Sequence, residues 1–177
     1  MSHAQRAVIA IHGGAGTISR DTSPAEIAAY HEALADALRA GQTVLAAGGS
    51  ALEAVTEAVR HLEDCPRFNA GRGAVFTHEG THELDAAIMD GATLDAGAIA
   101  CVHRVRNPIL AARSVLEHSP HVLLMGEGAE AFAAANGAEL VESGYFFTEG
   151  RYAQWQRALA DAAVALDHDM PLKKEPI

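Results

Sequence analysis

Basic residues and cysteines are scarce in this sequence of 177 residues. Lysine and arginine together number 13 against 23 acidic residues, and the formal net charge is −10. The sequence contains no basic cluster larger than Lys173-Lys174, so nucleic-acid binding is not expected, because contacts with phosphate groups depend on basic side chains. The only two cysteines, Cys65 and Cys101, form neither a CxxC pair nor a disulfide framework, which favours a reducing compartment.

Long apolar runs are also missing. Residues 1–6 lead directly into a short apolar segment, and no stretch resembles a signal peptide or a membrane span. We therefore expect a soluble, cytoplasmic protein without a membrane partner. Hydrophobic residues make up 49% of the chain, which is enough for the core of one globular domain.

A convincing catalytic nucleophile is lacking as well, since the sequence has no GxSxG motif. It nevertheless contains three segments rich in glycine and carboxylates: His12-Gly13-Gly14-Ala15-Gly16, Phe68-Asn69-Ala70-Gly71-Arg72-Gly73-Ala74-Val75-Phe76 and Glu83-Leu84-Asp85-Ala86-Ala87-Ile88-Met89-Asp90-Gly91. Amide hydrolysis needs an activated nucleophile, a base and hydrogen-bond donors for the oxyanion, and this chain can supply only the donors. The chain has the character of half an active site.

Hydrophobic periodicity and turn residues predict a mixture of helices and strands. Ser23 and Ser50 each begin a predicted helix with a capping box, and the first of these helices is expected to end at Gly41. Further helices are predicted from Asn107-Pro108, from Gly128 and over 152–166. Strands are predicted at 7–12, 73–77, 83–90, 96–105 and 121–125, and the third and fourth of these are joined as an antiparallel hairpin. This pattern indicates a layered α/β or α+β domain.

The three glycine- and carboxylate-rich segments, in this order and spacing, resemble the plant-type L-asparaginase and isoaspartyl peptidase family of N-terminal-nucleophile hydrolases. The resemblance runs from Ala7 to about His168 and corresponds to the α chain of that family. A family precursor cuts itself into an α chain and a β chain, and the new N-terminal threonine of the β chain is the nucleophile. The resemblance implies an amidohydrolase that cleaves β-aspartyl dipeptides and L-asparagine. Glycosylasparaginase and taspase remain alternatives within the same class.

The resemblance also implies a four-layer αββα sandwich in which two sheets lie between helices. Residues 1–166 would be the α-subunit part of one domain, and residues 167–177 a flexible tail ending near the cleavage site. A β chain from the same precursor would complete the fold, and two such pairs would form an (αβ)2 assembly.

Gly13, Gly14 and Asn69 are the candidate site residues. Glycines at 13 and 14 allow close backbone approach or a positive φ, although an ordinary turn would also use them. The amide of Asn69 can both donate and accept hydrogen bonds, although an Asx-turn would also explain it. The resemblance implies that the glycine loop supports the threonine and that Asn69 lies beside it.

The segment from residue 62 to residue 72 turns around Pro66 and Gly71, which can direct several carbonyls toward a hard cation. Taken alone, the pattern is weak. The resemblance implies a structural sodium ion and no cofactor for catalysis. The carbonyls matching its ligands belong to Leu62, Glu63, Cys65, Phe68, Ala70 and Arg72. Arg72 departs from the apolar residue that often stands there.

Other polar residues are interpreted as structural. Asp85 and Asp90 are five positions apart on a predicted strand, so they point to opposite faces and are expected to make hydrogen bonds at the strand ends. His78 and His82 have the spacing of a zinc helix, but Gly80 between them would break such a helix. We expect both histidines to be exposed in a loop.

Two rival functions are compatible with parts of the sequence. Residues 126–131 fit the pattern G-x-G-x-x-A of a nucleotide-binding module, but Glu127 and Glu130 would repel a pyrophosphate. The second rival is an inactive scaffold subunit, which would apply if no threonine followed Ile177. The identity of the residue at the amino terminus of the companion chain separates this rival from the hydrolase.

Overall fold

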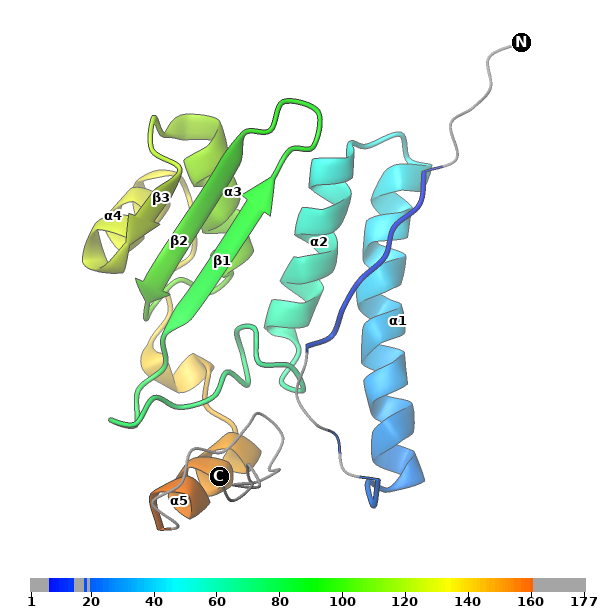
Figure 1. Ribbon diagram of the computed structural model, residues 1–177, viewed down its shortest axis with the longest axis vertical. Coiled ribbons are helices and arrows are strands. Elements are labelled where there is room, and N and C mark those ends of the chain that lie inside the picture. The colour runs from blue at the N-terminus through cyan, green and yellow to red at the C-terminus, as the bar shows by residue number, and fades with distance from the viewer. Residues whose placement is uncertain (1–6, 15–17, 19, 161–177) are drawn as a thin grey trace, which may run out of the picture.

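The structure, a computed structural model, describes residues 7–14, 18 and 20–160. Its elements are α1 Pro24–Ala46, α2 Ala51–Asp64, β1 Leu84–Met89, β2 Ala96–Val102, α3 Pro108–His118, β3 Leu123–Met125, α4 Gly126–Ala135, the 3₁₀ helix η1 Ser143–Tyr145 and α5 Glu149–Ala160 (Figure 1). The predicted mixed α/β class is therefore confirmed. The predicted tail at 167–177 and the end of the predicted helix at 152–166 lie outside the described residues.

Two capping boxes begin α1 and α2, as predicted. The side chains of Ser23 and Ser50 accept hydrogen bonds from the N–H groups of Glu26 and Glu53, whose carboxylates accept the serine N–H groups in return. The predicted end of α1 at Gly41 was wrong. Gly41 lies within the helix at its contact with α2, where a Cβ atom would be only 2.8 Å from the carbonyl oxygen of Ala54.

The three strands form one sheet in the order β1-β2-β3. As predicted, β1 and β2 are antiparallel and joined by a hairpin, whereas β3 pairs with β2 in parallel. The predictions at 83–90, 96–105 and 121–125 are confirmed with shorter bounds.

The predicted strands at 7–12 and 73–77 were wrong. Residues 7–12 run along the first two helices, where no described strand lies beside them (Figure 1). In the second segment, the N–H of Gly73 donates to the carbonyl of Phe146, and the N–H of Val75 donates to the side chain of Asn69. These backbone groups therefore bond to loops instead of to a neighbouring strand.

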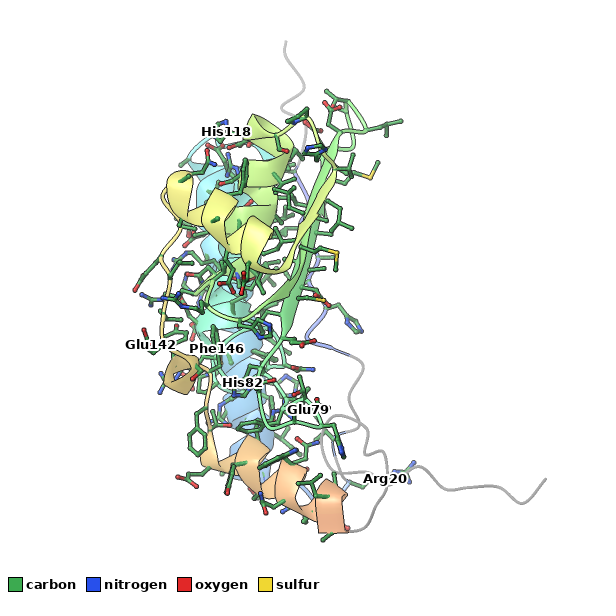
Figure 2. The ribbon with its side chains drawn as sticks, turned by 90° about the vertical axis from the view of Figure 1, so that its left-hand side faces the viewer. Arg20, Glu79, His82, His118, Glu142 and Phe146 are labelled. Carbon is green, nitrogen blue, oxygen red and sulfur yellow. The ribbon has the colours of Figure 1, made fainter. Side chains whose placement is uncertain are left out.

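The main hydrophobic core lies between the sheet and the helices. Gly97 of β2 lets α3 approach closely, because a Cβ there would overlap the carbonyl oxygen of Ala112. Figure 2 shows the helices on one side of the sheet. On the other side, Met89, Leu123 and Met125 are 55%, 52% and 60% exposed, so the described part of the chain leaves this face uncovered. None of the described helices combines the length and the apolar character needed to cross a membrane.

Candidate functional site

The two predicted site segments lie side by side. Phe68 is buried in a small hydrophobic cluster with Ala37 and Leu62, and Leu34 packs against this cluster. A Cβ on Gly13 would lie 2.8 Å from Cδ2 of Leu34 and 3.3 Å from Cε1 of Phe68. The structure therefore brings Gly13 next to the residue that precedes Asn69 in the chain.

Gly14 has a backbone conformation that strongly favours glycine. Its φ angle is +111°, and its N–H donates to Nδ1 of His12 at 3.2 Å. An added Cβ would meet nothing within 4 Å, so backbone strain and not a lack of space restricts this position. The loop thus presents open backbone at Gly14, next to Gly13, which packs against Phe68.

Asn69 is exposed, and its side chain is held at one end. Its Oδ1 accepts the N–H of Val75 at 3.0 Å. In the described part of the chain, its Nδ2 has no hydrogen-bond partner. The amide is therefore oriented by its acceptor while its two donor hydrogens remain available for an oxygen atom.

The loop after α2 folds back on the end of that helix. Pro66 has no N–H to offer the carbonyl of Leu62, which lies four residues earlier. The N–H of Arg72 donates to the carbonyl of Glu63 at 2.7 Å, and a Cβ on Gly71 would lie 2.6 Å from the same oxygen. The result is a compact turn lined with backbone carbonyls.

Three of the six carbonyls predicted as sodium ligands already accept one hydrogen bond each. Those of Leu62, Glu63 and Cys65 accept the N–H groups of Cys65, Arg72 and Phe68 at 3.3, 2.7 and 3.4 Å. No backbone hydrogen bond from a described residue reaches the carbonyls of Phe68, Ala70 or Arg72. Because a carbonyl oxygen has two lone pairs, all six retain capacity for a cation. Oxygen donors of this kind fit a hard cation.

The side chain of Glu63 has a role that the sequence analysis missed. It is only 2% exposed, and its Oε1 accepts the N–H of Ile109 in the first turn of α3 at 2.7 Å. Asn107, the N-cap residue of that helix, makes no capping hydrogen bond with its own side chain. Burial raises the pKa of Glu63 to about 8, and the hydrogen bonds from Ile109 and Asn107 oppose this rise. Glu63 thus ties the base of the loop to α3.

Asp85 and Asp90 make structural hydrogen bonds, as predicted. Asp85 accepts the N–H of Cys101 at 2.8 Å, where β2 has a bulge and Cys101 has a φ of +53°. Asp90 accepts the N–H of Ala92 at 2.8 Å in the hairpin turn.

The prediction that His82 is exposed was wrong, whereas His78 is exposed. The ring centroid of His82 lies 4.3 Å from that of Phe76 and 5.9 Å from that of Phe146. Its Nδ1 bonds the carbonyl of Val75 at 3.2 Å, and its Nε2 is buried and finds no partner among the described residues. His82 precedes buried Leu84 by two residues, so the period of an extended chain could have predicted this burial. No metal-binding cluster of histidine, cysteine and carboxylate side chains occurs among the described residues.

Protonation of His82 is expected to destabilise the fold at acidic pH. Burial lowers the pKa of this imidazole, so the folded state binds its proton less readily than the unfolded state, where the pKa is about 6.5. The stabilisation is therefore complete above about pH 7. It is lost as the pH falls through the folded-state pKa. Urea unfolding of the parent and of His82→Phe between pH 7.5 and pH 5 measures this contribution.

The parent should lose stability relative to His82→Phe as the pH falls, and parallel curves would contradict this expectation. Taking the difference removes the opposite trend of Glu63, whose raised pKa reduces stability as the pH rises from about 4.5 toward 8. His78→Gln changes an exposed residue of the same loop and should keep the pH profile of the parent.

The nucleotide-binding alternative is not favoured. α4 begins at Gly126 directly after β3, as the pattern required. However, Oε1 of Glu130 accepts the N–H groups of His103 and Arg104 at 2.6 and 2.9 Å, so this residue serves the fold. With exposed Glu127 it places two carboxylates near the start of the helix, which disfavours a phosphate there.

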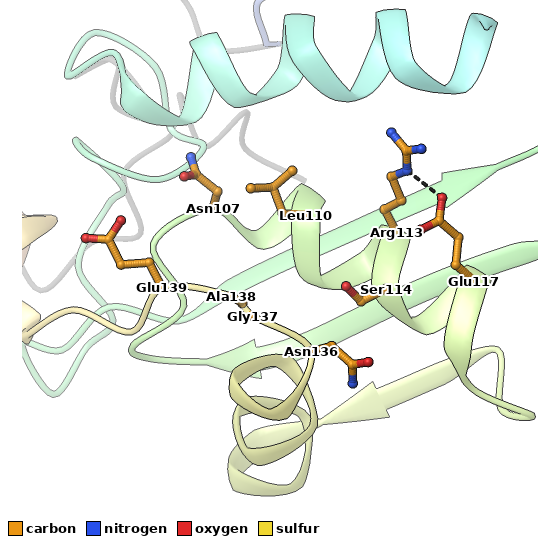
Figure 3. A pocket seen from close by; sticks show the side chains of 9 residues that line it. All are labelled: Asn107, Leu110, Arg113, Ser114, Glu117, Asn136, Gly137, Ala138 and Glu139. Atoms are coloured by element: carbon orange, nitrogen blue, oxygen red, sulfur yellow. Dashed lines mark hydrogen bonds and ion pairs between the residues drawn. The ribbon is translucent and has the colours of Figure 1, made fainter.

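A surface pocket of about 460 Å³ lies between α3 and the end of α4 (Figure 3). The charged groups in its lining are already paired. Arg113 donates to Glu117 at 2.7 Å, and Glu139 pairs with Arg106 at 2.8 Å. The lining contains none of the predicted site residues. We therefore place the candidate site at the glycine loop and Asn69.

Comparison with known proteins gives consistent matches over most of the chain. Residues 5–176 match the protein family described as Asparaginase. An isoaspartyl peptidase from Escherichia coli (strain K12) is 58% identical over 164 residues, which cover 92% of this chain and 51% of that protein. A plant-type L-asparaginase from Thermococcus kodakarensis is 50% identical over 150 residues, covering 85% of this chain and 47% of that protein. An isoaspartyl peptidase/L-asparaginase from Danio rerio is 40% identical over 163 residues, covering 92% and 51%. The chain spans about half the length of the curated relatives it matches.

Proposed function

Because this chain belongs to the asparaginase family, we propose that it is the α-subunit part of an isoaspartyl peptidase with L-asparaginase activity. Its substrates would be β-aspartyl dipeptides and L-asparagine. Family membership confirms the resemblance drawn from the three sequence motifs. The observation that carries the proposal is that Gly13 packs against Phe68, the residue before Asn69, and that the amide donors of Asn69 are available.

Amide hydrolysis requires a nucleophile, a base and donors for the oxyanion. In the proposed reaction, an N-terminal threonine of the partner β chain supplies the first two through its hydroxyl and its α-amine. The hydroxyl oxygen attacks the side-chain carbonyl carbon of the substrate, and the α-amine passes the proton to the departing amine. Water then hydrolyses the acyl-enzyme and releases aspartate. Asn69 Nδ2 donates to an oxygen in this site, and Gly13 lets the loop that supports the threonine pack closely against Leu34 and Phe68.

The uncovered face of the sheet supports a second sheet from the β chain. Met89, Leu123 and Met125 together form an apolar surface that water solvates poorly. No backbone hydrogen bond between described residues involves residues 7–12, and Val8 is 89% exposed, so this segment is open to a neighbouring strand. We propose that the β chain from the same precursor completes a four-layer αββα sandwich and that two pairs form (αβ)2. Both cysteines are free, which supports the reducing cytoplasm as the location.

We also propose a structural sodium ion in the loop after α2. The carbonyls of the six residues named above would hold it and would fix the turn that leads to Asn69. The ligand at Arg72 would be its carbonyl, so the charged side chain does not prevent binding. Dialysis into potassium or choline buffer should lower the melting temperature, and return of sodium should restore it.

The central experiment uses the full-length gene product. N-terminal sequencing of the companion polypeptide should find threonine, and the assembled protein should hydrolyse β-aspartyl-leucine. A fragment of residues 1–177 alone should be inactive. A residue other than threonine at the amino terminus of the companion chain would contradict the hydrolase proposal. Activity of the isolated fragment would contradict the proposal that the two chains form the site together.

Gly13→Val should slow self-cleavage of the precursor. The valine side chain would press on Leu34 and Phe68 and would displace the loop from the site. Electrophoresis during expression measures the appearance of the two chains. Gly128→Val is the matched control, because a Cβ there meets nothing within 4 Å. Equal rates of cleavage for Gly13→Val and the parent would contradict the proposed close approach.

A further inference from the structure

α5 makes hydrogen bonds and ring contacts with residues 73–80, which follow Asn69 in the chain. Nε of Arg151 donates to the carbonyl of Gly73 at 2.8 Å, and Nε1 of Trp155 donates to the carbonyl of His78 at 3.2 Å. The rings of Trp155 and Phe76 are stacked with centroids 5.5 Å apart. A Cβ on Gly80 would lie 2.8 Å from Cζ2 of the same indole, so the ring rests against the loop backbone.

The attached segment is the one that orients Asn69. Gly73 is held at both of its peptide groups, because its N–H also donates to the carbonyl of Phe146 at 2.9 Å. Two residues later, Val75 donates its N–H to Oδ1 of Asn69 at 3.0 Å. Two hydrogen bonds, joined by the backbone of residues 73–75, thus connect Arg151 to the side-chain amide of Asn69.

α5 is peripheral to the hydrophobic core. Neither core cluster of the described residues contains a member of α5. Figure 1 shows this helix below the sheet, beside the segment that leads from α2 to β1. Arg151 in this peripheral helix is nevertheless only 8% exposed. A guanidinium is rarely buried unless it is hydrogen-bonded, so its contacts with the loop are important for its position. Loss of these contacts is therefore expected to affect the loop more than the core.

We propose that Arg151 and Trp155 are positioning residues for the hydrolysis, which act by holding residues 73–76 so that Val75 fixes the amide of Asn69. This inference rests on the proposed function. Arg151 restrains the carbonyl of Gly73, and Trp155 restrains the ring of Phe76 and the turn at Gly80. Together they set the direction in which Asn69 Nδ2 donates.

The test compares Arg151→Met with the parent in the full-length, self-cleaved protein. Methionine keeps much of the apolar volume but cannot donate to Gly73. We expect kcat for β-aspartyl-leucine to fall about 10-fold with little change in KM, because a small misplacement of a catalytic group costs turnover. Gln156→Ala is the control on the same helix, since Gln156 is exposed, and it should keep parental kinetics. Trp155→Phe, which retains an aromatic ring, should keep more turnover than Trp155→Leu.

A double-mutant cycle with Asn69→Ala separates positioning from general stability. If Arg151 acts through Asn69, Arg151→Met should cause almost no further loss of kcat in the Asn69→Ala background. The same 10-fold loss in both backgrounds would overturn the inference, as would a parental kcat for Arg151→Met. If Arg151→Met does not fold, the same cycle with Trp155→Leu tests the inference, because that variant removes the ring that stacks on Phe76. A parent protein that is inactive toward β-aspartyl-leucine would instead refute the proposed function.

Discussion

Asn69→Ala is expected to reduce kcat for β-aspartyl-leucine by about 100-fold, the typical effect of removing one oxyanion donor. The side chain is exposed, and the substitution removes only its hydrogen bond with the N–H of Val75. The expected loss of folding stability is therefore about 1 kcal/mol or less. Steady-state kinetics and urea unfolding on the assembled protein measure the two effects separately.

Asn69→Asp tests the amide donor alone. Aspartate keeps the size of the side chain and an oxygen acceptor for Val75, but it has no amide donor when ionised. It should therefore lose turnover as strongly as Asn69→Ala while retaining parental stability. Asn136→Ala, at the exposed end of α4, is the control for a general effect of losing an asparagine. Parental kinetics in both Asn69 variants would exclude Asn69 from the site.

Gly97→Val is expected to destabilise the protein by about 3 kcal/mol, at the upper end for overpacking of a core. A Cβ at Gly97 would overlap the carbonyl oxygen of Ala112 and would lie 2.7 Å from Cβ of Leu116. Ala112 is fully buried, and the overlapping atom belongs to its backbone, so rotation of a side chain cannot relieve the contact. The helix and the sheet must separate, which exposes the core between them.

Thermal unfolding followed by circular dichroism measures the effect of Gly97→Val. A loss of 3 kcal/mol corresponds to a melting temperature about 6–12 °C lower for a chain of this size. Gly91→Ala is the control, because a Cβ at that exposed hairpin position meets no atom within 4 Å. An unchanged melting temperature for Gly97→Val would show that β2 and α3 do not pack as closely as described.

Local signals predicted much of the fold correctly. The capping boxes at Ser23 and Ser50 place donors and acceptors within four residues of one another, so the helix starts can be read from the sequence. The hairpin between β1 and β2 is local for the same reason. Gly41 misled the prediction because its small size serves the contact with α2 and not the end of a helix.

Features that depend on distant partners could not be predicted in this way. The segment at 73–77 has the composition of a strand. However, the N–H and the carbonyl of Gly73 form hydrogen bonds with Phe146 and Arg151, which lie more than seventy residues later in the chain. The side chain of Glu63 looked like an ordinary acid at the end of a helix, and only the tertiary fold shows that it receives the N–H of Ile109. Motif spacing predicted the family and the candidate site residues, and the structure adds how Val75 orients Asn69.

The bare apolar surface formed by Met89, Leu123 and Met125 has a consequence for how such a protein must be made. Two halves synthesised separately would expose this surface, and copies would aggregate before they found their complement. When both halves are linked in one polypeptide, the tether raises their local concentration, so the surface is covered as the chain folds. In the proposed two-chain assembly, cleavage would therefore be safe only as a late event, after the β chain has covered this surface.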